Sequence, residues 1–151
     1  SGNISLTVKN SNVLGTVVKY PTGSVFGGGD ASSVRGHINV SVDESTVNGF
    51  VFGGGNKGEA GTQGQSQPFT YTKVIVDQSE VKQDVFGGGL GAPVYGNTAV
   101  WIKGENCFIH GSVLGGGFGG DVSGDTHVQI GGDTDKYKKC HLTGGTADCN
   151  D

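Results

Sequence analysis

The chain has 151 residues, of which 31 are glycine, 33% are hydrophobic and only 16% are charged. Its formal net charge is −4, which leaves no basic face for nucleic-acid phosphates, and no apolar run approaches the ~18 residues of a transmembrane helix. Glycine is about three times as frequent as usual, whereas the low charge argues against a solvated disordered chain.

Strands are predicted where two apolar residues are separated by a single residue. Alternation of this kind places both apolar side chains on the same face of a strand. No stretch repeats apolar residues with a helical period, so no helix is expected. In chain order, the five alternating pairs are Leu6/Val8, Val40/Val42, Val74/Val76, Val100/Ile102 and Val128/Ile130.

A triple-glycine segment recurs four times along the chain. Three copies read Val-Phe-Gly-Gly-Gly, and the fourth reads Val-Leu-Gly-Gly-Gly. We predict that these glycines stack at a bend, where positive φ and the close approach of neighbouring backbones both exclude side chains. The glycines are Gly27, Gly28, Gly29, Gly53, Gly54, Gly55, Gly87, Gly88, Gly89, Gly115, Gly116 and Gly117.

Two further marks keep the same order in the repeats. A Val-x-x-Ser-x-Val pattern starts at residues 8, 42 and 76, and a valine follows three of the glycine segments, at 34, 94 and 122. Equivalent valines at 40, 74, 100 and 128 are 34, 26 and 28 residues apart, which indicates a 26-residue repeat with insertions. The largest insertion, at 56–72, is predicted to be a surface loop, and a smaller one is expected around 18–24.

These repeats predict an all-β fold, namely a parallel β-helix (β-solenoid) of about four to five coils with Gly-Gly-Gly turns. A 26-residue unit cannot bury its own core, but stacked units can, because equivalent side chains form ladders. The repeat domain is expected to span 1–132, with a C-terminal cap or disordered tail at 133–151. The two expected ladders are Phe26, Phe52, Phe86 and Leu114, and Val42, Val76, Ile102 and Ile130.

The sequence resembles the glycine-rich repeat regions of bacterial surface β-helix proteins of the adhesin-like and autotransporter-like kind. The resemblance covers about residues 4–130 and rests on the glycine segments and the alternating pairs. It implies a secreted or cell-surface module with a structural or adhesive role and no catalysis. The implied partners are similar repeats, by self-stacking, and a glycan or host-surface ligand. No functional residue carries over, because stacking rather than a catalytic signature defines such proteins.

An outward-pointing tryptophan is the main binding candidate. Trp101 lies between the inward-facing Val100 and Ile102, and an exposed tryptophan often marks a binding surface. Tyr95 is the second candidate for stacking on a sugar. Tyr71 and Phe69 are the other aromatic residues compared for this role.

Two sets of aspartates admit both a chemical and a structural interpretation. The segment that ends at Asp121 fits the first part of a calcium-binding nonapeptide, with Asp125 as a further ligand, but Ser123 stands where an apolar residue is needed. A plain turn is the alternative there, and no other cofactor is expected. Asp43 and Asp77 occupy equivalent repeat positions, where they form either a catalytic pair or turn caps.

Two alternatives to a non-catalytic module stay open. One is a truncated carbohydrate-active β-helix enzyme, a lyase or glycoside hydrolase, which acids and bases gathered on one sheet face would favour. The other is a filament-forming subunit that stacks end to end, since the ends of a solenoid are unpaired strand edges. For Cys140 and Cys149, a disulfide and free thiols are both open.

Overall fold

The computed structural model describes residues 2–16, 22–64, 70–131 and 140–142 of the chain. Within these residues the secondary structure consists of strands, turns and bends, and no helix is present, which confirms the predicted all-β class. The described part accordingly holds no helix that is long and apolar enough to span a bilayer. The registered pairs between its strands all run parallel.

The strands form three sheets, which we call A, B and C. Sheet A contains the long strands β1 (Ile4–Lys9), β4 (Ile38–Asp43), β8 (Thr70–Asp77), β11 (Val94–Lys103) and β14 (Thr126–Ile130), and β7 (Ala60–Gly61) pairs with β11. Sheet B contains β2 (Asn12–Val13), β5 (Thr46–Val47), β9 (Glu80–Val81), β12 (Cys107–Ile109) and β15 (Cys140–Leu142). Sheet C contains β3 (Val25–Phe26), β6 (Val51–Phe52), β10 (Val85–Phe86) and β13 (Val113–Leu114).

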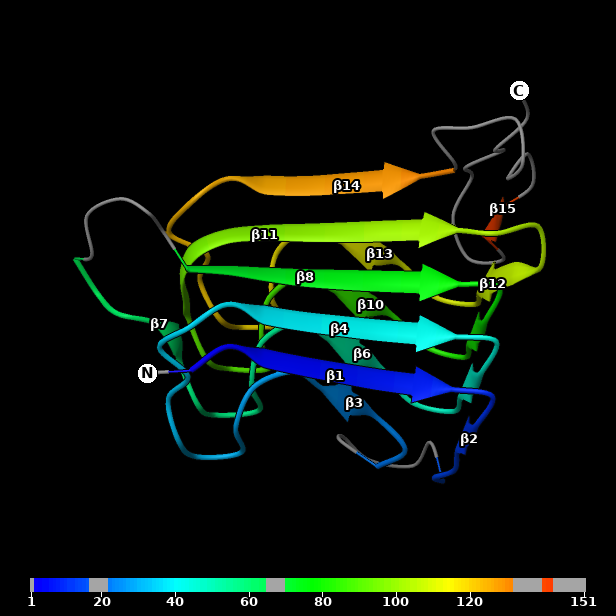
Figure 1. The fold of residues 1–151 in the computed structure, drawn as a ribbon, viewed down its shortest axis with the longest axis horizontal. Coiled ribbons are helices and arrows are strands. Elements are labelled where there is room, and N and C mark those ends of the chain that lie inside the picture. The colour runs from blue at the N-terminus through cyan, green and yellow to red at the C-terminus, as the bar shows by residue number, and fades with distance from the viewer. Residues whose placement is uncertain (1, 17–21, 65–69, 132–139, 143–151) are drawn as a thin grey trace.

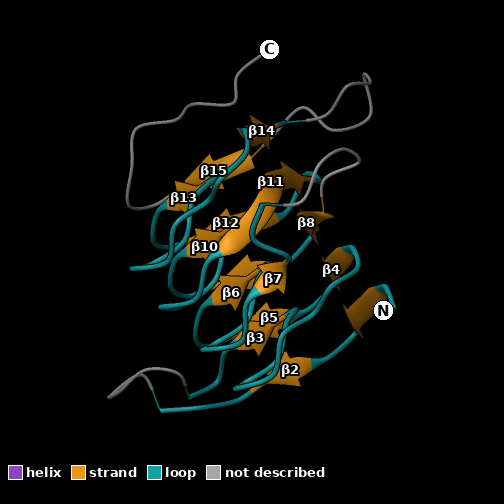
Figure 2. Ribbon diagram, turned by 90° about the vertical axis from the view of Figure 1, so that its left-hand side faces the viewer, coloured by secondary structure: helices purple, strands orange, loops and turns teal. Residues whose placement is uncertain are grey.

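The chain visits the three sheets in a constant order, from A to B to C, and then returns to A beside its previous strand. We call one such round a tier. Figure 1 shows the sheet A strands one above another, from blue β1 to orange β14, and Figure 2 shows the strands of the other sheets stacked in the same direction. Neighbouring strands in each sheet are therefore one sequence repeat apart.

The register of sheet A matches the sequence repeat residue for residue. Val42 pairs with Val76, Val76 pairs with Ile102, and Ile102 pairs with Ile130. The first three side chains are at most 1% exposed, and Ile130 packs against them from the last tier. This predicted ladder is confirmed, and it forms one wall of a continuous apolar core.

The predicted aromatic ladder in sheet C forms, with Phe52 and Phe86 buried and Phe26 partly buried at its first step. The rings of Phe26, Phe52 and Phe86 stack with centroid separations of 4.8 Å at both steps. Leu114 continues the register above Phe86, but it is 39% exposed. The prediction that Leu114 is buried was wrong, because β13 is the last described strand of sheet C and nothing described covers it.

The triple glycines are required by close backbone approach and not by positive φ. None of the twelve has a φ in the left-handed region, so that part of the prediction was wrong. A Cβ atom at Gly54 would lie 2.8 Å from the backbone nitrogen of Gly89 in the next tier, and one at Gly28 would lie 2.6 Å from the nitrogen of Gly55. At Gly116 no atom lies within 4 Å of the added Cβ, since this glycine is in the last described tier of sheet C.

The corner between sheets A and B does use left-handed backbone. Asn10, Glu44 and Gln78 have φ between 46° and 48°, and Gly104 takes the same corner with φ 99°. A non-glycine residue costs roughly 1–2 kcal/mol in this conformation, so packing around the corner must offset that cost.

The predicted loop at 56–72 is partly ordered structure. Ala60 is fully buried in β7, bridges to Val34 in the tier below and pairs with Val94 in the tier above. Ala60 thus takes the place of the valine that the second glycine segment lacks. Residues 65–69 and 17–21 lie outside the described part, as does the predicted cap at 133–151 apart from β15.

Candidate functional site

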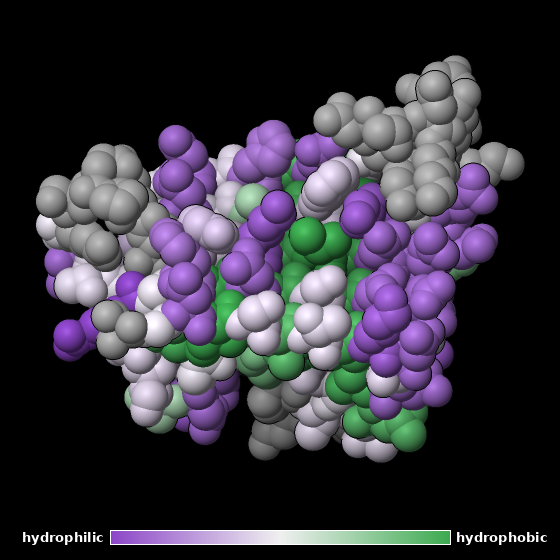
Figure 3. All heavy atoms as spheres, viewed as in Figure 1, coloured by the Kyte–Doolittle hydropathy of each residue, from purple (hydrophilic) through white to green (hydrophobic). Residues whose placement is uncertain are grey.

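Strand alternation gives sheet A an outer surface on which polar side chains are mixed with a few apolar and aromatic ones. In β4 and β11 every second residue is buried, and the residues between them point outward. We call this surface the sheet A outer face, and Figure 3 views it directly, with hydrophilic side chains gathered over the carboxyl ends of the strands. Its members are Ser5, Thr7, Lys9, Asn39, Ser41, Asp43, Tyr71, Lys73, Ile75, Asp77, Asn97, Ala99, Trp101, Lys103, His127 and Gln129.

A ladder of four charged residues crosses the carboxyl ends of β1, β4, β8 and β11. Lys9, Asp43, Asp77 and Lys103 are register partners in that order. Lys9 Nζ lies 2.7 Å from Asp43 Oδ2, and Lys103 Nζ lies 3.0 Å from Asp77 Oδ2. Two carboxylates in direct register repel each other, and the flanking lysines balance them. We call these four residues the charge ladder.

The predicted stacking of Asp43 and Asp77 is therefore correct, but the two lysines were missed. Lys9 stands at the same repeat position as Asp43, one tier below, and only the register reveals the pairing. The hydrogen bond from Lys9 to Asp43, together with the carboxylate's charge, raises the pKa of Lys9 above its ordinary value of 10.5. The second pair is more enclosed, with side-chain exposures of 21% for Lys103 and 16% for Asp77. The Oδ1 atom of Asp77 is buried without a hydrogen-bond partner.

Trp101 lies on the sheet A outer face as predicted, but it is half-buried rather than freely exposed. Its Nε1–H donates a 3.0 Å hydrogen bond to the carbonyl of Gly131. The ammonium groups of Lys103 and Lys73 lie 5.0 and 5.9 Å from the ring centroid, within the range of cation–π attraction. The indole is thus held in one orientation with positive charge beside it.

A second aromatic position on this face involves Tyr71. Its ring stacks on His37 with a centroid separation of 4.1 Å, and its backbone N–H donates to His37 Nδ1 at 3.2 Å. Tyr71 was among the aromatic candidates named from the sequence, but its partner was not identified, because His37 lies one tier away in the stack. Tyr95 is half-buried near the start of β11, where it pairs with Gly61, and the structure does not bring it beside Trp101.

The calcium candidates form no ligand set in the described part of the chain. Both Asp121 and Asp125 are exposed, and no three His, Cys, Asp or Glu side chains there are grouped so that they could hold a metal ion. The backbone of Asp125 instead donates to Asn97 Oδ1 at 2.9 Å. Cys149 lies outside the described residues, so whether Cys140 and Cys149 form a disulfide or are free thiols stays open.

A scan against protein-family models gave no match, and searches of curated proteins and of solved structures gave none either. The function must therefore be argued from the chain's own residues.

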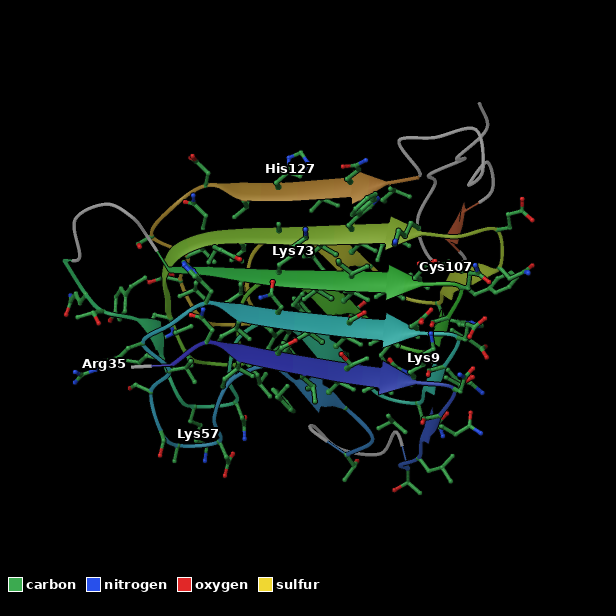
Figure 4. The ribbon with its side chains drawn as sticks, viewed as in Figure 1. Lys9, Arg35, Lys57, Lys73, Cys107 and His127 are labelled. Atoms are coloured by element: carbon green, nitrogen blue, oxygen red, sulfur yellow. The ribbon has the colours of Figure 1, made fainter. Side chains whose placement is uncertain are left out.

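The sheet A outer face offers two kinds of chemistry. At the carboxyl ends of the strands, the charge ladder places two carboxylates next to two ammonium groups. Toward the middle and the amino ends, aromatic rings alternate with Lys73 and with hydroxyl and amide side chains; Figure 4 labels Lys9 and Lys73 in these two regions. The first arrangement suits ion pairing or proton transfer, and the second suits a ligand with both apolar and polar surfaces.

Proposed function

We propose that the chain is a segment of a parallel β-solenoid that serves as a non-catalytic structural or adhesive module of an extracellular surface protein. The observation that carries this proposal is the constant order of sheets A, B and C combined with in-register pairing between equivalent repeat residues. Such stacking buries apolar ladders between the sheets of the described residues and leaves a regular outer surface. The resemblance to glycine-rich surface repeats supports an extracellular location.

The solenoid can be tested by cross-linking neighbouring tiers. Thr7 and Ser41 are register partners on the sheet A outer face, whereas Thr7 and Ile75 are two tiers apart. With the native cysteines replaced by serine, Thr7→Cys with Ser41→Cys should form a disulfide on oxidation, because adjacent strands lie about 4.8 Å apart. Thr7→Cys with Ile75→Cys should not. Cross-linking of both pairs, or of neither, would reject the stacked arrangement.

The non-catalytic role is tested by a screen for turnover of polysaccharides, with and without Ca²⁺. Reducing-end release and the absorbance of unsaturated products would detect hydrolase and lyase activity respectively. We expect neither, because each carboxylate of the charge ladder is paired with a lysine. Turnover that is lost in Asp77→Asn and kept in the exposed-site control Glu59→Gln would overturn the proposal.

A carbohydrate-active enzyme is the second candidate function, and one specific observation favours it. The charge ladder does place acids and bases on one sheet face, with the carboxylates of Asp43 and Asp77 in direct register. A carboxylate pair of this kind is a common catalytic arrangement in glycoside cleavage. The structural role is preferred because the lysines neutralise the pair and Asp77 is largely enclosed.

The proposed module also stacks with similar repeats. In the last described strands of sheets A and C, Val128 and Leu114 are each 39% exposed, whereas their partners Val100 and Phe86 are 0% and 3% exposed. A further repeat of the same pattern would cover these residues and continue sheets A and C. Sedimentation velocity should show concentration-dependent association that Val128→Lys weakens and that Ser123→Lys, at an exposed site outside the strands, does not.

A further inference from the structure

We propose that the sheet A outer face binds an extended anionic polysaccharide, with a sugar carboxylate at Lys73 and sugar rings packed on Tyr71 and Trp101. This inference rests on the proposed non-catalytic surface role and names the ligand class of that surface. It is carried by three features of the face: two oriented aromatic rings, a lysine between them that forms no ion pair with any described residue, and flanking hydrogen-bonding side chains.

The two aromatic rings are fixed before any ligand binds. Tyr71 is 38% exposed and is held by its stacking on His37. Trp101 is held by the hydrogen bond from its Nε1–H to the carbonyl of Gly131. Rings that are already immobilised lose little conformational entropy on binding, so they are suited to packing against the apolar faces of sugars.

The spacing of the two rings fits a polymer rather than a single sugar. Tyr71 pairs with Asn97, which is four residues before Trp101 on β11. At about 3.3 Å per residue, the Cα atoms of Tyr71 and Trp101 are offset by roughly 13 Å along the strand direction. A ligand that touches both rings must therefore be an extended chain of several sugars running along the strands.

Lys73 supplies the charge complementarity. It lies two residues after Tyr71 on β8, and its Nζ is 5.9 Å from the Trp101 ring centroid. Unlike Lys9 and Lys103, Lys73 forms no ion pair with any described residue. A carboxylate on a sugar packed against Trp101 would meet this ammonium, and charge-assisted hydrogen bonds of this kind are stronger than neutral ones.

The neighbours of Lys73 match the hydroxyl groups of a sugar chain. Asn39 is its register partner on β4. Asn97, whose Oδ1 already accepts from the Asp125 backbone N–H, is the partner of Tyr71 on β11. The backbone groups of β8 are paired on both sides, so an extended peptide cannot add as a strand on this face.

The experiment compares two ligands that differ only at C6 of each sugar, where one carries a carboxylate and the other a hydroxymethyl group. Oligoglucuronates, made by oxidising C6 of cello-oligosaccharides, and the parent neutral oligosaccharides of equal length would be titrated into the full chain by calorimetry. We expect the oligoglucuronate to bind at least about tenfold more tightly, with affinity that falls as salt is added. Equal affinity for both ligands, or no binding of either, would overturn the inference.

Variants locate the site on the face. Lys73→Gln and Trp101→Ala should each weaken oligoglucuronate binding about tenfold, equivalent to ~1.4 kcal/mol. The matched controls Lys82→Gln and Phe108→Ala, both at exposed positions of the sheet B region, should bind like the parent chain. If Trp101→Ala fails to fold, Tyr71→Ala and Lys73→Gln still test the site, since neither residue is in the core. Binding unaffected by these changes would contradict the site.

The two proposals fail in distinguishable ways. Loss of cross-linking between neighbouring tiers, or the appearance of turnover, would reject the structural module. Absence of oligoglucuronate binding by a chain that still cross-links would reject the ligand assignment alone.

Discussion

Ser79 Oγ accepts the backbone N–H of Ser45, one tier below, at 3.0 Å, while its own hydroxyl donates to the Asp77 carbonyl at 2.6 Å. Ser45 repeats this arrangement with Ser11 and the Asp43 carbonyl. The serines of the Val-x-x-Ser-x-Val pattern therefore form a hydrogen-bond ladder at the corner between sheets A and B. They connect tiers at a point where the strands themselves have ended.

Ser79→Ala should lower the free energy of unfolding by about 1–3 kcal/mol, because it leaves the buried N–H of Ser45 without its acceptor. Ser79 is 2% exposed, so water does not readily replace the hydroxyl. Ser41→Ala on the sheet A outer face is the matched control and should change stability by less than about 0.5 kcal/mol. Denaturant unfolding would measure the free energy of unfolding of both variants, provided that their m-values are equal. Equal losses of stability in the two variants would contradict the role of the serine ladder.

The same glycine-to-alanine change should destabilise the protein in one tier and have almost no effect in another. Gly54→Ala forces a Cβ against the backbone of Gly89 and should destabilise by about 1–3 kcal/mol or more. Gly116→Ala meets open space and should be nearly neutral. Thermal unfolding of the two variants gives the comparison, and similar melting temperatures would mean that the tiers are not in contact at the triple glycines.

Removing one partner of the Lys103–Asp77 ion pair should lower the stability of the folded protein. Lys103→Met leaves Asp77 largely enclosed beside Asp43 and should destabilise by about 1–3 kcal/mol. Adding Asp77→Leu should restore much of that loss, because it removes the uncompensated charge. A double-mutant cycle from denaturant unfolding would measure the coupling. Additive effects of the two changes would show that the ion pair contributes nothing.

The Lys9–Asp43 ion pair predicts that the stability of the folded protein changes with pH in the alkaline range. The hydrogen bond to Asp43 and the carboxylate's charge raise the pKa of Lys9 above 10.5 in the folded chain. The resulting stabilisation is fully present below the unfolded pKa and is lost as pH rises through the higher folded pKa. The stability difference between the parent chain and Lys9→Met should thus be constant up to about pH 10 and shrink above it. A difference that grows with pH would contradict the pairing.

The strand ladders could be predicted because each repeat preserves the alternation of apolar residues. Val42, Val76, Ile102 and Ile130 carry that signal in full, and their register follows from it. Ala60 could not be found in this way, since an alanine within an insertion lacks both the residue type and the spacing of the equivalent valines.

The candidate site was only partly predictable because its contacts join different tiers. Asp43 and Asp77 share a repeat position and residue type, so we expected them to stack. Lys9 occupies the same repeat position one tier below, but because it is a lysine there, the repeat pattern alone did not reveal that it pairs with Asp43. The stacking of His37 on Tyr71 was hidden for the same reason. The sequence could not show that the triple glycines are selected by close backbone contact and not by positive φ, because both requirements select glycine.

The direction of the backbone hydrogen bonds determines how the molecule would respond to mechanical force. In all three sheets these bonds run between tiers, so a pull that separates the ends of the stack loads the tiers in series. Repeats of 26, 28 and 34 residues would then detach one at a time, each releasing about 90–120 Å of chain. A protein of this kind would lengthen in steps and absorb energy at each one.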